Sequence, residues 1–318
     1  MQFFTKVPLA TVHNPINYRS NIVAMGSCFV ENIGAKLDYF KFHHTSNPFG
    51  IIFNPKSVEK IIQRSVRKDF YTEKQLFFHN ERWHCFEIHS DLSHSDKEYM
   101  LQMLNDNLIS LYNQLSTASH FVLTLGTAWV YKFIESQEIA ANCHKIPQKN
   151  FSKHLLTTAE ITKSLENIAA LIGSLNSKCH FIYTISPVRH LKDGFVENQV
   201  SKSNLISAVY ELVREPQNKN DLSYFPSYEI MMDELRDYRF YNGDLIHPNA
   251  TAIDYIWSRF VETYIEKSSY TTMAQVQTIQ KALQHKPFNA ASHLHQKFLR
   301  NLHEKVEQIQ TEFPHMQF

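Results

Sequence analysis

The chain has 318 residues, a formal net charge of +1, and 43% hydrophobic and 13% aromatic residues. This composition predicts one large globular domain with an extension, or two small domains, and excludes an intrinsically disordered chain. The near balance of 32 basic and 31 acidic residues argues against a nucleic-acid or anionic-membrane partner, because such partners select strongly basic surfaces. No apolar run approaches the ~18 residues of a membrane-spanning helix.

The four cysteines lie far apart in the sequence, at Cys28, Cys85, Cys143 and Cys179, and form no CxxC pair. We therefore expect neither a structural zinc site nor a disulfide framework, and no cofactor. The first 14 residues contain no sustained apolar segment and no small-residue cleavage site. This pattern favours a cytoplasmic protein.

Three continuous apolar runs predict strands that are buried on both faces of a parallel sheet, and helical patterns separate them. In chain order, the predicted elements are a strand at 22–25, helices at 29–39 and 96–115, a strand at 121–125, a helix at 158–175 and a strand at 181–185. This alternation predicts an α/β fold with a mostly parallel sheet.

Two segments interrupt the alternation and predict β-hairpins, one at 75–88 with its turn near 80–81 and one at 129–142 with its turn at 135–137. After residue 265 no strand is predicted, and residues 266–318 are expected to form two polar helices broken near Pro287 and Asn289. We therefore expect a main α/β domain at 1–265 and a helical extension at 266–318.

Polar residues follow each predicted strand, and ligands of open α/β sheets bind outside the carboxyl ends of the strands. Ser27 follows the first strand, residues 126–127 follow the second, and residues 186–190 follow the third. Residues 244–247 come just before a helix predicted at about 249–265. These four segments are expected to share one rim of the sheet.

Ser27 lies between a strand and a helix, where free backbone N–H groups can stabilise an anion. The alternative is that Ser27 only caps the helix. Asp244 precedes His247 by three residues, so its carboxylate can accept from Nδ1 and leave Nε2 to take a proton from a serine. A plain surface turn ahead of a helix that starts at Pro248 is the alternative for this pair.

The order of these motifs resembles the SGNH/GDSL hydrolases, and more closely the GSCFA family of that superfamily. The segments that resemble the family are MGSCFVENIG at 25–34, NPFGIIFNP at 47–55, LTLGTAWVY at 123–131, NCHKIP at 142–147, SPVRH at 186–190, YFPSYE at 224–229 and DYRFY at 237–241. The resemblance implies a three-layer, flavodoxin-like α/β/α fold and an esterase mechanism. It matches Ser27 to the nucleophile and Asp244 and His247 to the catalytic dyad.

The resemblance also implies an oxyanion hole formed by the backbone N–H groups of Ser27 and Gly50. The superfamily carries an asparagine in its third block, whereas this chain has Gly-Thr-Ala-Trp at 126–129. Thr127, Asn47 or Asn142 then supplies the hydrogen-bond donor that replaces this asparagine. Otherwise the oxyanion hole has one donor fewer and stabilises the oxyanion less. Loss of one such donor typically lowers the rate by ~10²–10³, which leaves room for a slow or non-catalytic site.

Cys28 is an alternative nucleophile, because a thiol at a helix N-terminus can have a lowered pKa. Ser27 is preferred because it occupies the nucleophile position of the family. The next helical position, Cys28, is expected to point into the fold.

Other side chains are candidates for substrate contact. Residues 142–145 are interpreted as a lip in which His144 or Lys145 contacts substrate, or as a plain loop. Arg189 is suited to a substrate carboxylate or phosphate, or to a structural ion pair, and His190 is a second candidate base. A group of aromatic residues is expected either to flank a sugar or acyl group of the substrate or to belong to the core. Its members are Tyr224, Phe225, Tyr228, Tyr238, Phe240 and Tyr241.

Taken together, these patterns predict a serine hydrolase that forms an acyl-enzyme on Ser27. Its substrate is expected to be a small-molecule or saccharide ester carrying an O-acyl group. An acyltransferase with the same residues and a non-catalytic ligand-binding module are the alternatives.

Overall fold

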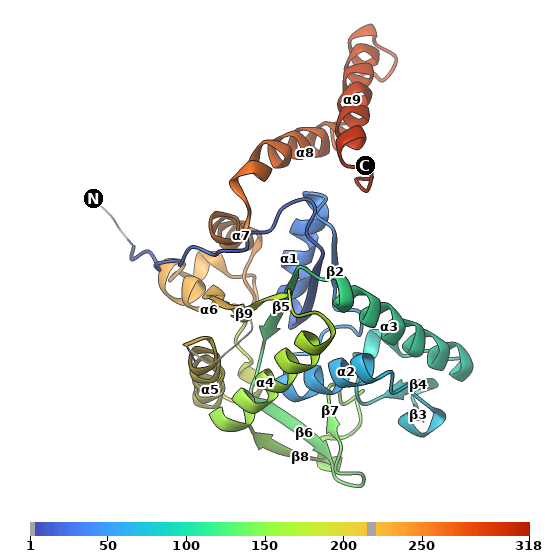
Figure 1. The fold of residues 1–318 in the computed structure, drawn as a ribbon, viewed down its shortest axis with the longest axis vertical. Helices are drawn as coiled ribbons and strands as arrows, with labels where there is room; N and C mark the ends of the chain where they lie inside the picture. The colour runs from blue at the N-terminus through green and yellow to red at the C-terminus, as the bar shows by residue number, and fades with distance from the viewer. Residues whose placement is uncertain (1–3, 215–220) are drawn as a thin grey trace.

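The computed structural model describes residues 4–214 and 221–318 (Figure 1). At its centre is a parallel five-stranded sheet in the order β2-β1-β5-β9-β10. The bounds are β1 Ile22–Gly26, β2 His44–Ser46, β5 His120–Leu125, β9 His180–Ile185 and β10 Leu222–Phe225. Counted along the chain, these strands have the flavodoxin-like order 2-1-3-4-5. The α/β fold with a parallel sheet is confirmed, and β2 and β10 are additions that their short, partly polar sequences did not reveal.

Helices cover both faces of the sheet and give the three layers (Figure 1). Val23 and Met25 pack in the cluster that contains α2 to α5, whereas Ile22 and Ala24 pack in the cluster that contains α1 and α7. Successive side chains of a strand point to opposite faces, which explains the alternation. The helices are α1 Cys28–Tyr39, α2 Pro55–Arg67, α3 Lys97–Thr117, α4 Thr158–Leu175, α5 Phe195–Arg214, α6 Ser227–Glu229 and α7 Ala250–Tyr264.

Local capping side chains set where the helices begin, because each accepts a hydrogen bond from a first-turn N–H group. The caps are Ser27 for α1, Asn54 for α2, Asp96 for α3, Thr157 for α4 and Asn249 for α7. In α4, Glu160 bonds back to the Thr157 N–H and completes a capping box. The four predicted helices of the sheet region therefore begin within two residues of their expected positions.

Both predicted hairpins are confirmed. Strands β3 Leu76–His79 and β4 Arg82–Cys85 are joined by Asn80 and Glu81, both with positive φ, as a tight two-residue turn requires. Strands β6 Trp129–Phe133 and β7 Ile139–Ala140 form the second hairpin, and β8 Phe151–Leu155 adds a third strand beside β6.

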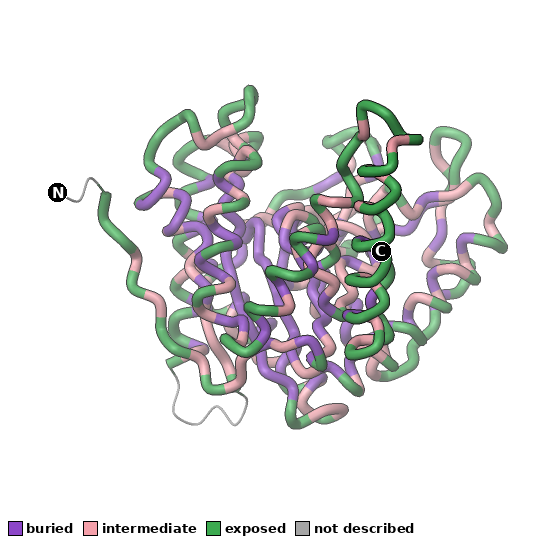
Figure 2. Tube along the Cα trace, turned by 90° about the horizontal axis from the view of Figure 1, so that it is seen from above, coloured by how far each residue is buried: buried purple, intermediate pink, exposed green. Residues whose placement is uncertain are grey.

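The C-terminal segment forms α8 Tyr270–Leu283 and α9 His293–Glu312, which confirms two helices with a break between them. Figure 1 shows them extending away from the sheet, and Figure 2 shows that the chain near the C-terminus is largely exposed. None of the described helices is long and apolar enough to cross a membrane. The domain bounds 1–265 and 266–318 stay a prediction, and the first range includes residues 1–3 and 215–220, outside the described residues.

Candidate functional site

The sheet order places the topological switch point between β1 and β5. The chain leaves β1 toward β2 at one side and leaves β5 toward β9 at the other, and ligands of such sheets bind at this switch point. Ser27 follows β1 and Gly126 follows β5. A Cβ atom at Gly26, where φ is +138°, would lie 2.1 Å from the Thr124 carbonyl oxygen, so the turn that presents Ser27 requires glycine.

Ser27 is the N-cap of α1 and is fully buried. Its Oγ accepts a hydrogen bond from the Phe29 N–H at 3.3 Å. The capping interpretation is therefore confirmed, but capping uses a lone pair of the hydroxyl oxygen and leaves its proton free to be transferred. Capping and nucleophilic attack are compatible roles for this side chain.

His190 lies in the same small space as Ser27. A Cβ atom built on Gly126 would be 2.5 Å from Phe53 Cβ, 3.0 Å from His190 Nε2 and 3.3 Å from Ser27 Cβ. His190 Nε2 is buried without a hydrogen-bond partner. Burial lowers the pKa of His190 to about 4, helped by the charge of Lys202, so the ring is neutral near pH 7.

Lys202 of α5 lies beneath this site and was missed by the sequence analysis. It is fully buried, and its Nζ donates to the carbonyl oxygens of Gly126 and Ser186, each at 2.8 Å. Burial lowers the pKa of Lys202 to about 7. A signal existed, because Lys202 is three residues before Leu205 and four after Asn198 on the buried face of α5, but residues 195–214 were not predicted as a helix.

The contact expected from the DxxH spacing is present. His247 Nδ1 lies 2.6 Å from Asp244 Oδ2, and Asp244 Oδ1 accepts from the N–H groups of His247 and Ile246 at 3.0 and 2.9 Å. The backbone N–H groups of His247 and Ile246, with the His247 ring, hold the pKa of Asp244 at about 2. The carboxylate is therefore ionised near neutral pH and fixes the imidazole with Nε2 facing away.

In the described part of the chain no hydrogen bond joins Ser27 to His247. Both nevertheless lie near His190. The charge of His247 contributes to the lowered pKa of His190, which is packed beside the Ser27 turn. Arg189, next to His190, donates from Nη2 to the carbonyl oxygen of Leu245 at 3.4 Å.

The backbone N–H groups predicted for the oxyanion hole already have acceptors within the protein. The Ser27 N–H donates to the Thr124 carbonyl at 3.0 Å, and the Gly50 N–H donates to the Asn47 carbonyl at 2.8 Å. The Thr127 N–H donates to the Phe53 carbonyl at 3.3 Å. Buried backbone groups must find partners, and these turns satisfy one another.

Among the described residues, the Cys28 N–H at the start of α1 has no backbone acceptor of this kind. The Phe29 N–H donates to Ser27 Oγ and the Val30 N–H donates to the Ser27 carbonyl. The Cys28 N–H has no acceptor one turn earlier in the helix. Among the first-turn groups it is therefore the donor best placed for an anion, in the position that follows a nucleophile.

Asn47, a candidate for the missing oxyanion donor and for substrate contact, has a structural role here. Its Oδ1 accepts from the Gly26 N–H at 2.9 Å, and its Nδ2 donates to Glu31 Oε1 at 2.5 Å. The side chain is buried. It fixes the turn that carries Ser27.

The prediction that His144 contacts substrate is wrong. His144 is buried, with Nε2 bonded to the Cys85 carbonyl at 2.7 Å and Nδ1 at 3.1 Å from Nδ1 of His84. Asn142 Oδ1 accepts from the His144 N–H at 2.8 Å. Packing against the β3–β4 hairpin thus engages the ring nitrogens of His144 in hydrogen bonds within the protein.

Cys28 is poorly suited to act as a thiolate. Burial raises the pKa of its thiol, and the opposing effect of Lys202 only partly offsets this, so the neutral thiol predominates. Among residues 4–214 and 221–318, no three His, Cys, Asp or Glu side chains are grouped to hold a metal ion.

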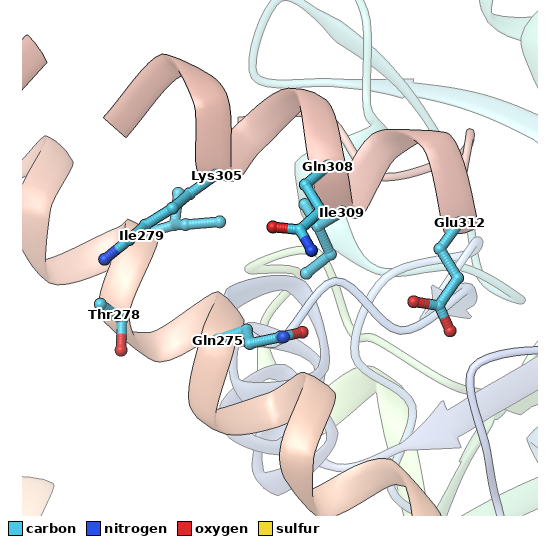
Figure 3. A pocket seen from close by; sticks show the side chains of 7 residues that line it. All are labelled: Gln275, Thr278, Ile279, Lys305, Gln308, Ile309 and Glu312. Carbon is cyan, nitrogen blue, oxygen red and sulfur yellow. The ribbon is translucent and has the colours of Figure 1, made fainter. Parts of the chain in front are cut away.

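A separate cavity of about 210 Å³ lies between α8 and α9, far along the chain from the Ser27 turn (Figure 3). Its lining is mostly amide and aliphatic, from Gln275, Thr278 and Ile279 of α8 and Lys305, Gln308, Ile309 and Glu312 of α9. It contains neither a cysteine nor a histidine, and it offers no nucleophile–base pair.

Comparison with protein families gives two matches. The model of the GSCFA family matches residues 21–260, which contain the whole sheet and the Ser27 and Asp244 segments. The model of the C-terminal domain of GSCFA domain proteins matches residues 276–318, which include α9 and part of α8. No curated protein matches the chain significantly.

Proposed function

We propose, for this chain that belongs to the GSCFA family, a serine-dependent ester hydrolase of the SGNH/GDSL type, with Ser27 as nucleophile and His247 as base. The observation that supports this most is the Asp244–His247 contact at 2.6 Å. It orients the imidazole and leaves its Nε2 free to accept a proton, while Ser27 begins a helix at the switch point of the sheet.

In this mechanism, Ser27 Oγ attacks the ester carbonyl carbon while its proton passes to His247 Nε2. The tetrahedral intermediate then expels the alcohol, which takes the proton from His247, and an acyl-Ser27 ester remains. His247 next accepts a proton from water, which attacks the acyl group. Collapse of the second intermediate releases the carboxylic acid and returns the proton to Ser27.

Two features support stabilisation of the oxyanion. The Cys28 N–H and the N-terminal end of α1 offer a positive potential. The ammonium group of Lys202, when protonated, adds positive charge beneath Gly126. Because Ser27 is fully buried, an ester reaches it only after neighbouring side chains such as Phe53 or His190, both half-buried, shift.

The O-acyl saccharide substrate rests on the resemblance to the family alone. An acyltransferase would use the same residues with a sugar hydroxyl in place of water. Analysis of products with and without an added acceptor separates these two reactions.

A non-catalytic ligand-binding module is a second candidate function. It is favoured by the full burial of Ser27 and by the internal hydrogen bonds of Ser27, Gly50 and Thr127 N–H groups. In that case the Asp244–His247 pair only orders the loop that precedes α7.

The test is reaction of the protein with a fluorophosphonate probe and a panel of short acyl esters. Wild type and Cys28→Ala should be labelled and active, whereas Ser27→Ala should lose both properties. Labelling of Ser27→Ala but not of Cys28→Ala would identify a thiol enzyme. Failure of intact wild type to react with either reagent would favour the binding module.

A further inference from the structure

A cavity beside the loop of Asp244 and His247 has the features of an anion-binding subsite. Its volume is about 220 Å³, several times the ~30 Å³ that one water molecule occupies in the liquid. Segment 231–241 supplies most of its walls, and Arg189 comes from the loop after β9. The lining residues are Arg189, Met231, Met232, Arg236, Asp237, Tyr238 and Tyr241.

Arg189 connects this cavity to the proposed catalytic loop. Its Nη2 donates to the Leu245 carbonyl oxygen at 3.4 Å, between Asp244 and His247 in the chain. The next residue, His190, shares the space beside Gly126 with Ser27. An acidic group bound by Arg189 would therefore lie close to the Asp244–His247 loop and to the Ser27 turn, so both could contact one substrate molecule.

The guanidinium of Arg189 lacks a counter-charge. No carboxylate of the described residues lies within salt-bridge distance, and its buried Nε has no hydrogen-bond partner. The guanidinium carbon lies 5.7 Å from the centroid of the Tyr241 ring. Buried donors are usually satisfied, and arginine forms a planar fork that matches carboxylate and phosphate oxygens.

The other charges of the cavity are already paired. Arg236 Nη2 donates to Asp233 Oδ1 at 2.7 Å. Asp237 Oδ1 accepts from the backbone N–H of Arg239 at 2.8 Å, and its Oδ2 lies 3.7 Å from Arg239 Nε. Arg189 is thus the cation of this lining that has no carboxylate partner among the described residues.

The mouth of the cavity is aromatic. The Tyr238 and Tyr241 rings are 5.9 Å apart and tilted by 49°, and Tyr238 is 65% exposed. Exposed aromatic faces of this kind suit the flat surface of a sugar or another ring.

We propose that this cavity is a subsite in which Arg189 binds a carboxylate or phosphate group carried by the substrate, with Tyr238 and Tyr241 against the adjoining ring. The inference rests on the proposed ester hydrolysis at Ser27 and specifies its substrate class as acidic esters.

The kinetic test compares 3-carboxyphenyl acetate and phenyl hydrogen succinate, which carry the acid on the alcohol side and on the acyl side, with their neutral methyl esters. We expect wild type to prefer one acidic ester over its neutral partner. Arg189→Met should reduce that ratio of kcat/KM by about tenfold or more, as for loss of a charged hydrogen-bonding group. Arg189→Lys should restore part of it, because lysine keeps the charge but not the fork.

Arg236→Met provides a matched control, because it removes an arginine that already has its own carboxylate. It should reduce the ratio less than threefold. An equal reduction in both arginine variants, or no preference for either acidic ester in wild type, would overturn the subsite.

A binding measurement separates this inference from the proposed reaction. 3-Hydroxybenzoate and inorganic phosphate are titrated calorimetrically into wild type, Arg189→Met and Ser27→Ala. We expect binding of at least one probe to wild type and Ser27→Ala, and loss of that binding in Arg189→Met. If esters are not hydrolysed but this pattern holds, the subsite stands and the hydrolase proposal fails. If neither probe binds wild type, the subsite is wrong.

Discussion

Burial of the Lys202 amine in α5 makes the stability of the protein depend on pH. Burial lowers its pKa from 10.5 to about 7. Between these two values the unfolded chain binds a proton that the folded protein does not, so the free energy of unfolding rises with pH. One group contributes at most about 1.4 kcal/mol per pH unit, which amounts to roughly 2–3 kcal/mol between about pH 7.5 and 9.5.

Lys202→Met removes this ionisation and keeps most of the side-chain volume. It also leaves the Gly126 and Ser186 carbonyl oxygens, now bonded at 2.8 Å, without a donor, at about 1–3 kcal/mol each. The variant should therefore be closest to wild type in stability near pH 7.5 and progressively weaker than wild type toward pH 9.5.

The assay is urea unfolding of wild type and Lys202→Met at three pH values in this interval. Groups that titrate in both proteins cancel when the two slopes are subtracted. Lys163→Met is the control, because the Lys163 side chain is 67% exposed and its loss should leave the slope unchanged. Parallel pH slopes for wild type and Lys202→Met would refute the assignment of a neutral buried lysine.

The remaining predictions concern the Ser27 site. Asp244→Asn should lower kcat by ~10⁴ with little change in KM, because Asp244 stabilises the imidazolium formed in the transition state; steady-state kinetics that show less than a tenfold loss would remove it from the mechanism. His190→Ala should retain the rise of rate with pH that His247→Ala abolishes, and the reverse pattern would make His190 the base. Ser27→Ala should lower the free energy of unfolding by ~1 kcal/mol through loss of the cap on Phe29, whereas Ser27→Gly should cost only a few tenths; urea unfolding that ranks the two variants in the opposite order would argue against the cap.

Several features of this protein were determined by local sequence. The continuous apolar runs at 22–25, 121–125 and 181–185 predicted the three central strands, because strands covered on both faces cannot alternate polar and apolar residues. The Asp244–His247 contact followed from a separation of three residues, which a single turn brings together. The two C-terminal helices were predicted from the absence of strand patterns after residue 265 and from the break near Pro287.

Only the tertiary structure decided which polar groups of the site remain free. Lys202 meets the Gly126 carbonyl across 76 residues of chain, and His144 meets the Cys85 carbonyl across 59. The predicted oxyanion donors were lost in the same way, since their partners come from neighbouring turns. Burial leaves each polar group to be satisfied by whatever folding places beside it, and no local pattern in the sequence encodes those distant neighbours.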